Sequence, residues 1–216
     1  MTPGQQGQEW ESRPDTDRTI RQYFRELSEL APRLPYQSIS NIVAAFLEAF
    51  AEQRTVYVFG NGGSAASASH MMCDINKGMG RTDAGKRPRV MALTDNTSLI
   101  TAWANDFGYE HIFSEQLKTF IKPRDVAFAI STSGDSPNVL LGLKTAREYG
   151  ALTVCLGGCQ GGQMKSLCDV CAIVPSNNVQ LVEDLHHAVI HSIFVGVRKN
   201  LLAGTAKALM ARVASF

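Results

Sequence analysis

The chain has 216 residues, enough for one well-buried domain with or without appendages. Hydrophobic residues make up 44% of it and charged residues 19%, and the net charge of +1 gives no electrostatic argument for binding nucleic acid or an anionic membrane. No stretch resembles a membrane span, and the first residues lack the apolar core of a signal peptide. The five cysteines form no disulfide framework, so we expect reduced thiols in a cytoplasmic protein.

Two amphipathic helices are predicted before the first strand. Apolar residues recur at helical spacing over residues 19–34, which end at Pro35, and again over residues 37–53. These helices must cover a sheet face or a second subunit. We therefore divide the chain into a flexible tail, a helical extension that covers the sheet or mediates oligomerisation, a main domain, and a helical C-terminal tail: residues 1–17, 18–54, 55–202 and 203–216.

The main domain is predicted to be α/β. Five short apolar runs are typical of buried strands, and helical stretches separate most of them: residues 56–59, 89–93, 125–130, 152–156 and 170–174. A long helix is expected over residues 179–202, and residues 205–213 form either its continuation or another helix. This alternation predicts one doubly wound, five-stranded parallel sheet of flavodoxin-like type, preceded by the helical extension.

A glycine-rich turn, Gly60-Asn61-Gly62-Gly63-Ser64, joins the first strand to the next helix. Glycines allow close backbone approach, and the N–H groups of a helix start favour anions. The turn is not a dinucleotide-binding fingerprint, because the third glycine is missing, and it has no Walker A lysine. Taken alone, it is equally consistent with tight packing.

A second polar loop follows the third strand. Ser131-Thr132-Ser133-Gly134-Asp135-Ser136 carries four hydroxyl groups in six residues before the helix that starts at Pro137. Some of these hydroxyls are expected to cap the helix, which is what serine and threonine commonly do. Four exceed what a cap needs, and loops at the carboxyl ends of parallel strands bind ligands. The two loops together predict a site for one monophosphate.

Two helices carry histidine and carboxylate side chains on one face. His70 and Asp74 are four residues apart, and Glu183, His187 and His191 form a stripe with the same spacing on the last helix. A lone histidine on such a helix is more often a core or interface group. Two helices with the same pairing favour a reactive or metal-binding site.

The cysteines give a weaker signal. Cys168 and Cys171 form a single CxxC motif, and Cys171 enters a predicted strand. No second CxxC is present, so we interpret the pair as packing rather than as a zinc or redox site.

Several motifs together resemble the sugar isomerase (SIS) domain family: GNGGSAASASH, LTDNTS, NDFGYEHIFSEQL, STSGDSPNVL and EDLHHAVIH. More narrowly, they resemble the phosphoheptose isomerases. This resemblance implies an aldose–ketose isomerase that converts sedoheptulose 7-phosphate to D-glycero-D-manno-heptose 7-phosphate through an enediol. It also implies a cytoplasmic homotetramer with its sites at subunit interfaces.

The resemblance also implies roles for individual residues. Asp74 occupies the position of the family's catalytic Glu, and His191 that of its second catalytic residue. A zinc ion would be bound by His70, Asp74, Glu183 and His191, with Glu183 where the family has Gln. Phosphate and sugar contacts are implied for the two loops, the segment after the second strand and the last helix: Asn61, Gly62, Gly63, Ser64, Asp95, Asn96, Ser131, Thr132, Ser133, Ser136 and Glu183.

Two of these residues depart from the family pattern. Asp74 has a shorter arm than Glu, and Glu183 adds a negative charge, so we expect a metal-occupied site in which Asp74 is either ligand or base. Two alternatives remain at this stage. One is a non-catalytic SIS module that binds a replication initiator protein, and the other is an isomerase for a different sugar phosphate.

Overall fold

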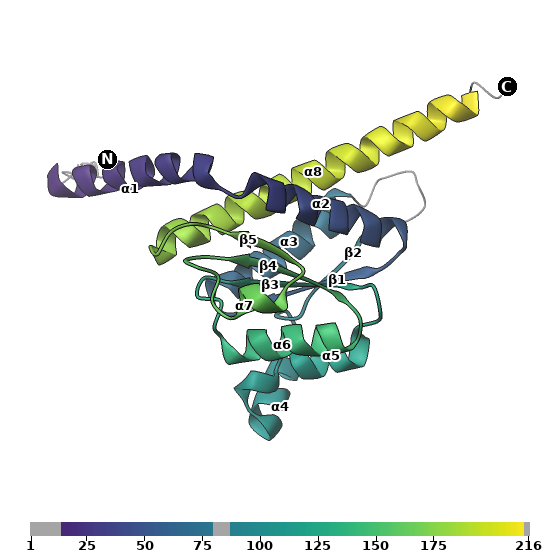
Figure 1. Cartoon of the computed structure of the whole chain (residues 1–216), viewed down its shortest axis with the longest axis horizontal. Coiled ribbons are helices and arrows are strands. Elements are labelled where there is room, and N and C mark those ends of the chain that lie inside the picture. The colour runs from purple at the N-terminus through teal and green to yellow at the C-terminus, as the bar shows by residue number, and fades with distance from the viewer. Residues whose placement is uncertain (1–13, 80–86, 214–216) are drawn as a thin grey trace, which may run out of the picture.

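The computed structural model describes residues 14–79 and 87–213, and shows a sheet between two layers of helices (Figure 1). All five strands are parallel, in the order β2-β1-β3-β4-β5. This confirms the predicted doubly wound α/β fold. The strand bounds are β1 Thr55–Gly60, β2 Arg89–Ala92, β3 Val126–Ser131, β4 Leu152–Gly157 and β5 Val170–Ile173.

The helices agree with the sequence pattern except at three places. The first begins at Pro14, so its start falls within the segment predicted as a tail, and residues 1–13 lie outside the described part. A short helix, α7, lies between the fourth and fifth strands, where no helix was predicted, and the last helix continues unbroken to Val213, the first of the two outcomes allowed for residues 205–213. The bounds are α1 Pro14–Leu30, η1 Ala31–Arg33, α2 Tyr36–Ala51, α3 Gly63–Gly78, α4 Thr97–Phe107, η2 Tyr109–His111, α5 Ser114–Phe120, α6 Pro137–Glu148, α7 Met164–Leu167 and α8 Val179–Val213.

Two separate apolar cores lie on the two faces of the sheet. Side chains of α2, α3 and α8 pack on one face, around Phe46, Phe128 and Ile190. Side chains of α5, α6 and α7 pack on the other, around Phe59, Phe113 and Leu143. Because helices cover both faces, the central strands β1, β3 and β4 are buried almost throughout, whereas the edge strand β2 alternates between exposed and buried positions.

The strand order places a crevice between β1 and β3. The chain leaves β1 toward β2 and leaves β3 toward β4, so the two connections diverge at this point, where α/β proteins bind ligands. The strands are close together here, because a Cβ on Gly60 would lie 2.5 Å from the carbonyl oxygen of Ile130. Only glycine fits at the end of β1, which fixes where the first loop starts.

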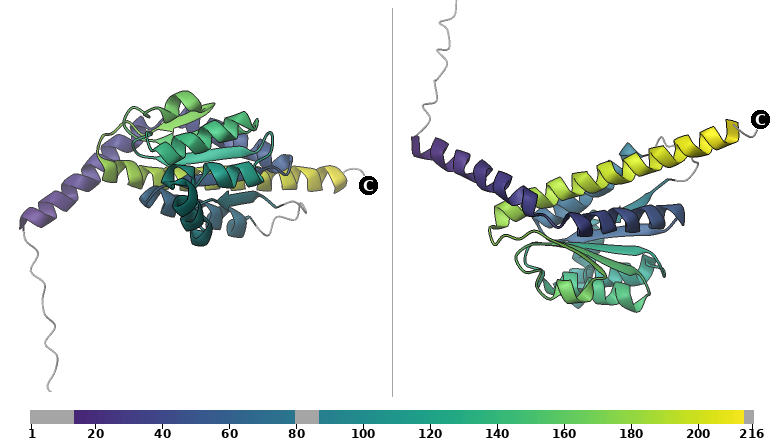
Figure 2. Two further views of the ribbon diagram at one scale, coloured as in Figure 1. Left: turned by 90° about the horizontal axis from the view of Figure 1, so that it is seen from below. Right: turned by 45° about the horizontal axis from the view of Figure 1, so that its top comes forward.

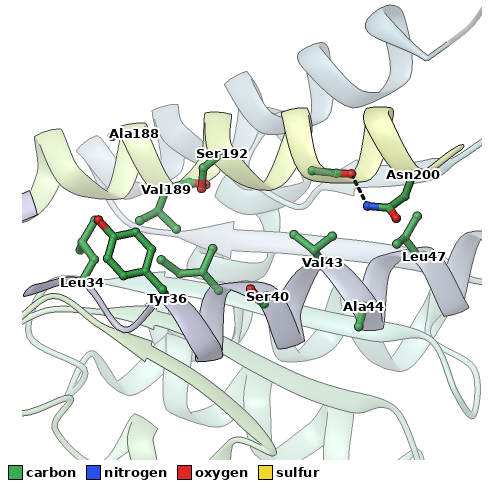
Figure 3. Close-up of a pocket in the computed structure, with 12 residues that line it drawn as sticks. Leu34, Tyr36, Ser40, Val43, Ala44, Leu47, Ala188, Val189, Ser192 and Asn200 are labelled. Carbon is green, nitrogen blue, oxygen red and sulfur yellow. Dashed lines mark hydrogen bonds between the residues drawn. The ribbon is translucent and has the colours of Figure 1, made fainter. Parts of the chain in front are cut away.

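The first and last helices extend beyond this body (Figure 2). The Tyr23 hydroxyl donates a 2.6 Å hydrogen bond to Asp184 Oδ2, which ties α1 to the start of α8. Between α2 and α8 lies a largely apolar groove of about 570 Å³ (Figure 3), lined among others by Val43, Val189 and Gly196. Within the described ranges, no helix is long and apolar enough to cross a membrane.

Candidate functional site

The first loop presents backbone rather than side chains. Gly62 has a positive φ of 54°, and with Gly63 it exposes the N-terminus of α3. Asn61 exchanges two hydrogen bonds with Asn138 of α6, at 2.9 and 2.7 Å, and accepts a third from the Tyr109 hydroxyl at 3.1 Å. The amide of Asn61 therefore holds the two loops together. The next N–H groups of α3 donate within the turn, so those of the exposed Gly62 and Gly63 are the ones that can receive an anion.

The hydroxyls of the second loop divide into two groups. Buried Ser131 accepts a hydrogen bond from the Gly134 N–H at 3.1 Å, which shapes the turn. Ser133 is exposed and accepts from the Asp135 N–H at 3.3 Å. Ser136, at the N-cap position of α6, makes no side-chain cap, and Thr132 is half-buried. Capping therefore explains only part of this hydroxyl cluster, which agrees with a phosphate-binding role.

The predicted sugar-contact residues after β2 are already engaged. Asp95 accepts a short hydrogen bond from Ser69 of α3. Asn96 caps α4 by accepting from the Leu99 N–H at 3.0 Å. Both side chains are exposed, so they retain acceptor capacity toward solvent and stay predicted substrate contacts.

Three predicted reactive residues come together from α3 and α8. His70 Nε2 lies 2.9 Å from His191 Nε2 and 3.2 Å from Asp74 Oδ2. His191 Nε2 lies 3.5 Å from the same carboxylate oxygen. These side chains are partly exposed, with between 29% and 51% of their surface accessible, so a substrate can reach them.

His187 is an additional member of this cluster. Its ring centroid lies 4.7 Å from that of His70 and 5.3 Å from that of His191, and its Nδ1 is 3.3 Å from Ser67 Oγ. Partial burial and the neighbouring imidazoles lower the pKa of His187. We call His70, Asp74, His187 and His191 the His–Asp cluster. The spacing of four along α8 is the sequence signal for His187, and it does not by itself indicate a role.

Glu183 lies elsewhere on α8. Its carboxylate stands beside the start of α3, where a Cβ on Gly63 would be 3.0 Å from Glu183 Oε1. The three imidazoles of His70, His187 and His191 offer ligand atoms within 4.8 Å of one another. His187, and not Glu183, is therefore the third residue whose ligand atom lies near those of His70 and His191.

His186 is a buried polar residue that the sequence reasoning missed. It is 1% exposed and lies beside the backbone of Gly157, at the end of β4, and its Nε2 atom is buried without a hydrogen-bond partner among the described residues. Burial lowers its pKa to about 4, so the ring is neutral near pH 7. It anchors α8 against the carboxyl edge of the sheet. Adjacent histidines give no sequence signal as to which one points inward, beyond the apolar periodicity of the helix.

The donor set of the His–Asp cluster suits two kinds of chemistry. A carboxylate and an imidazole at hydrogen-bonding distance can act as general base and general acid. Three imidazole nitrogens and a carboxylate oxygen are also typical ligands of zinc and similar divalent ions. The residues present thus fit a metal ion, with Asp74 next to the imidazole trio.

Several known proteins are similar to this chain in sequence and in fold. The SIS domain model matches residues 22–158. A phosphoheptose isomerase from Rhodospirillum rubrum is 41% identical over 169 residues, which are 78% of this chain and 86% of the relative. One from Pelobacter propionicus is 37% identical over 180 residues, 83% and 94% of the two chains. The structure of phosphoheptose isomerase GmhA from Neisseria gonorrhoeae has a TM-score of 0.79 at 27% identity, covering 85% of this chain and 99% of that one.

Proposed function

Because this chain belongs to the SIS domain family, and within it to the phosphoheptose isomerases, we propose that it interconverts sedoheptulose 7-phosphate and D-glycero-D-manno-heptose 7-phosphate. That it is a sugar-phosphate isomerase follows from the family, and the proposal concerns the sugar. The observation that carries it is the meeting of His70, Asp74 and His191 from two helices, α3 and α8.

The reaction moves one proton between two carbons and another between their oxygens, through an enediol. We assign the carbon-bound proton to Asp74 and, when no metal ion occupies the cluster, the oxygen-bound proton to His191. The 3.5 Å between Asp74 Oδ2 and His191 Nε2 suits two groups that act on adjacent atoms of one substrate. His70 contacts both and orients them.

The phosphate is assigned to the hydroxyl loop. Thr132, Ser133 and Ser136 offer hydroxyl donors beside the start of α6 without a basic side chain. The phosphate held there would fix the distance from the sugar carbonyl to Asp74. Binding energy from the non-reacting end of a substrate offsets the cost of orienting the reacting carbons and so raises the rate of the reaction.

Zinc is the cofactor that we assign to the cluster, through His70, His187 and His191. Asp74 then remains available as the base. A zinc ion bound there would polarise the sugar carbonyl, a task that otherwise falls to a proton on His191. Supporting this set, the three imidazoles lie within 4.8 Å of one another, whereas Glu183 faces Gly63.

A homotetramer with sites at subunit interfaces is the assembly that we propose, located in the cytoplasm. Ile20 and Phe24 on α1 are 52% and 63% exposed, and the groove between α2 and α8 is largely apolar. Such surfaces favour burial against another copy. The free state of all five cysteines agrees with a reducing compartment. Phe24→Glu should lower the mass measured by analytical ultracentrifugation, and an unchanged mass would argue against this surface.

Proton exchange tests the proposed reaction. Sedoheptulose 7-phosphate in deuterated water with the enzyme should gain deuterium at the carbon next to the carbonyl, followed by NMR, while the aldose accumulates. Fructose 6-phosphate, assayed in parallel, tests the alternative that the enzyme isomerises a different sugar phosphate. Exchange with that sugar but not with the heptulose would overturn the proposed substrate and keep the isomerase.

A further inference from the structure

Cys155 meets the two cysteines of the CxxC motif, Cys168 and Cys171, on the face of the sheet opposite the His–Asp cluster. Cys155, at the centre of β4, is fully buried, and the strand register pairs it directly with Cys171 of β5. Cys168 follows α7, and both Cys168 and Cys171 are half-buried. Their three Sγ atoms all lie within 4.8 Å of one another. We call these three residues the thiol cluster.

The backbone around the thiol cluster is held in place by a local hydrogen-bond network. Asp169 Oδ2 accepts from the Thr153 N–H at 2.9 Å and from the Thr153 hydroxyl at 2.8 Å, and that hydroxyl donates to the Leu167 carbonyl at 3.0 Å. These contacts fix the segments on both sides of Cys168 relative to β4. Support of this kind is what orients ligands at metal sites.

The three sulfur atoms lie near one another rather than only against apolar carbons. The Cys171 Sγ also lies 3.4 Å from the Lys165 carbonyl oxygen and 3.7 Å from that of Cys168. A buried cysteine that only fills space needs none of this.

We propose that Cys155, Cys168 and Cys171 bind a divalent thiophilic metal ion of the Zn²⁺ class. With Zn–S bonds of about 2.3 Å in tetrahedral geometry, three sulfur atoms stand about 3.8 Å apart, which fits their present spacing with small side-chain movements. Thiolates select soft ions over Mg²⁺ or Ca²⁺. Each thiol that binds releases its proton to solvent, and the partial exposure of Cys168 and Cys171 leaves the fourth position to water.

A divalent ion removes most of the charge of three thiolates. Three thiolates and a Zn²⁺ ion leave one net negative charge, and one cation, Lys165, and one anion, Asp169, lie nearby. A disulfide would use only two of the three sulfur atoms and would need an oxidant. Because Cys155 packs in the core with α5, α6 and α7, this site is separate from the proposed active site on α3 and α8 and does not depend on the proposed function.

Absorption spectroscopy with Co²⁺ or Cd²⁺ tests the proposal. The full chain, purified under reducing conditions and stripped of metal, should bind one ion with a near-ultraviolet thiolate-to-metal charge-transfer band, which the histidine site cannot produce. Cys171→Ser and Cys168→Ser should each weaken this binding by about tenfold or more. Cys73→Ser, which changes an exposed thiol on α3, is the matched control and should keep the band.

The proposal is overturned if no charge-transfer band forms with two equivalents of metal, enough for both the histidine site and the thiol cluster, or if Cys171→Ser retains the band at full intensity and affinity. Circular dichroism shows whether each variant folds. If both serine variants unfold, cadmium NMR of the unaltered protein decides, because a thiolate-bound ion and one bound by nitrogen and oxygen differ widely in chemical shift. A nitrogen- and oxygen-bound ion alone would then contradict the site.

Discussion

The His–Asp cluster and the thiol cluster occupy opposite faces of the same sheet, and they are built in different ways. The first joins two helices, His70 to His191 across 121 residues of sequence, and its side chains are partly exposed. The second joins two neighbouring strands and a short helix, and one of its members is fully buried. Exposure suits a site that must admit a sugar, whereas burial suits an ion held in place. Variants of Asp74 and His187 should therefore change the His–Asp cluster and leave metal binding by the thiol cluster unchanged.

Asp74→Asn should have the largest effect. Removing the carboxylate that we assign to the carbon-bound proton should lower kcat by roughly 10²- to 10⁴-fold, the usual contribution of general base catalysis. The rate of aldose formation measures this. Glu148→Gln, the same change at an exposed position at the end of α6, is the control. A kcat within a few-fold of the unaltered enzyme would remove Asp74 from the reaction.

His186 should make stability depend on pH. Its pKa is 6.5 in the unfolded chain and about 4 in the fold, so the unfolded state binds the proton first as pH falls. Stability attributable to this group is complete above pH 6.5, falls between pH 6.5 and 4, and levels off below, by about 3 kcal/mol in total. Urea unfolding of metal-stripped protein across this range should show a shallower slope for His186→Gln. Equal slopes would mean that the ring is not buried as a neutral group.

Ser133→Ala tests the phosphate loop. Ser133 is exposed, and its hydroxyl makes only a long 3.5 Å contact with the Ser131 hydroxyl besides accepting from the Asp135 N–H, so losing a hydrogen bond to a charged phosphate should raise KM by about tenfold or more while kcat changes less. Steady-state kinetics separate the two constants. Ser166→Ala, on α7, changes a hydroxyl that bonds the Gln163 carbonyl and serves as the comparison. Equal KM values for the two variants would place the phosphate elsewhere.

Two substitutions on α8 compare the candidate metal ligands. His187→Leu should weaken zinc binding by about tenfold or more, whereas Glu183→Gln should change it less, because that carboxylate faces Gly63. Titration calorimetry on the Cys171→Ser background isolates the histidine site. A larger loss of zinc affinity for Glu183→Gln than for His187→Leu would instead support the ligand set predicted from the sequence: His70, Asp74, Glu183 and His191.

The sequence predicted the parts of the structure that depend on local periodicity. Strand and helix order follow from apolar runs, and the pairing of His70 with Asp74 follows from helical spacing. What it could not supply were contacts made by tertiary packing. Cys155 joins Cys171 only through strand register, and Asn138 meets Asn61 only because the two loops face each other at the crevice. The CxxC motif thus gave two of three sulfur atoms, and its interpretation as mere packing gives way here to the proposed metal site.

The central claim is that this chain isomerises a heptose phosphate through the His–Asp cluster. Deuterium incorporation into sedoheptulose 7-phosphate, measured side by side for the unaltered enzyme and for Asp74→Asn, tests it most directly. The account predicts incorporation at the carbon next to the carbonyl with the unaltered enzyme. With the variant, the rate of incorporation should be lower by roughly 10²- to 10⁴-fold. Absence of incorporation with the unaltered, metal-loaded enzyme, or equal incorporation by both, would contradict it.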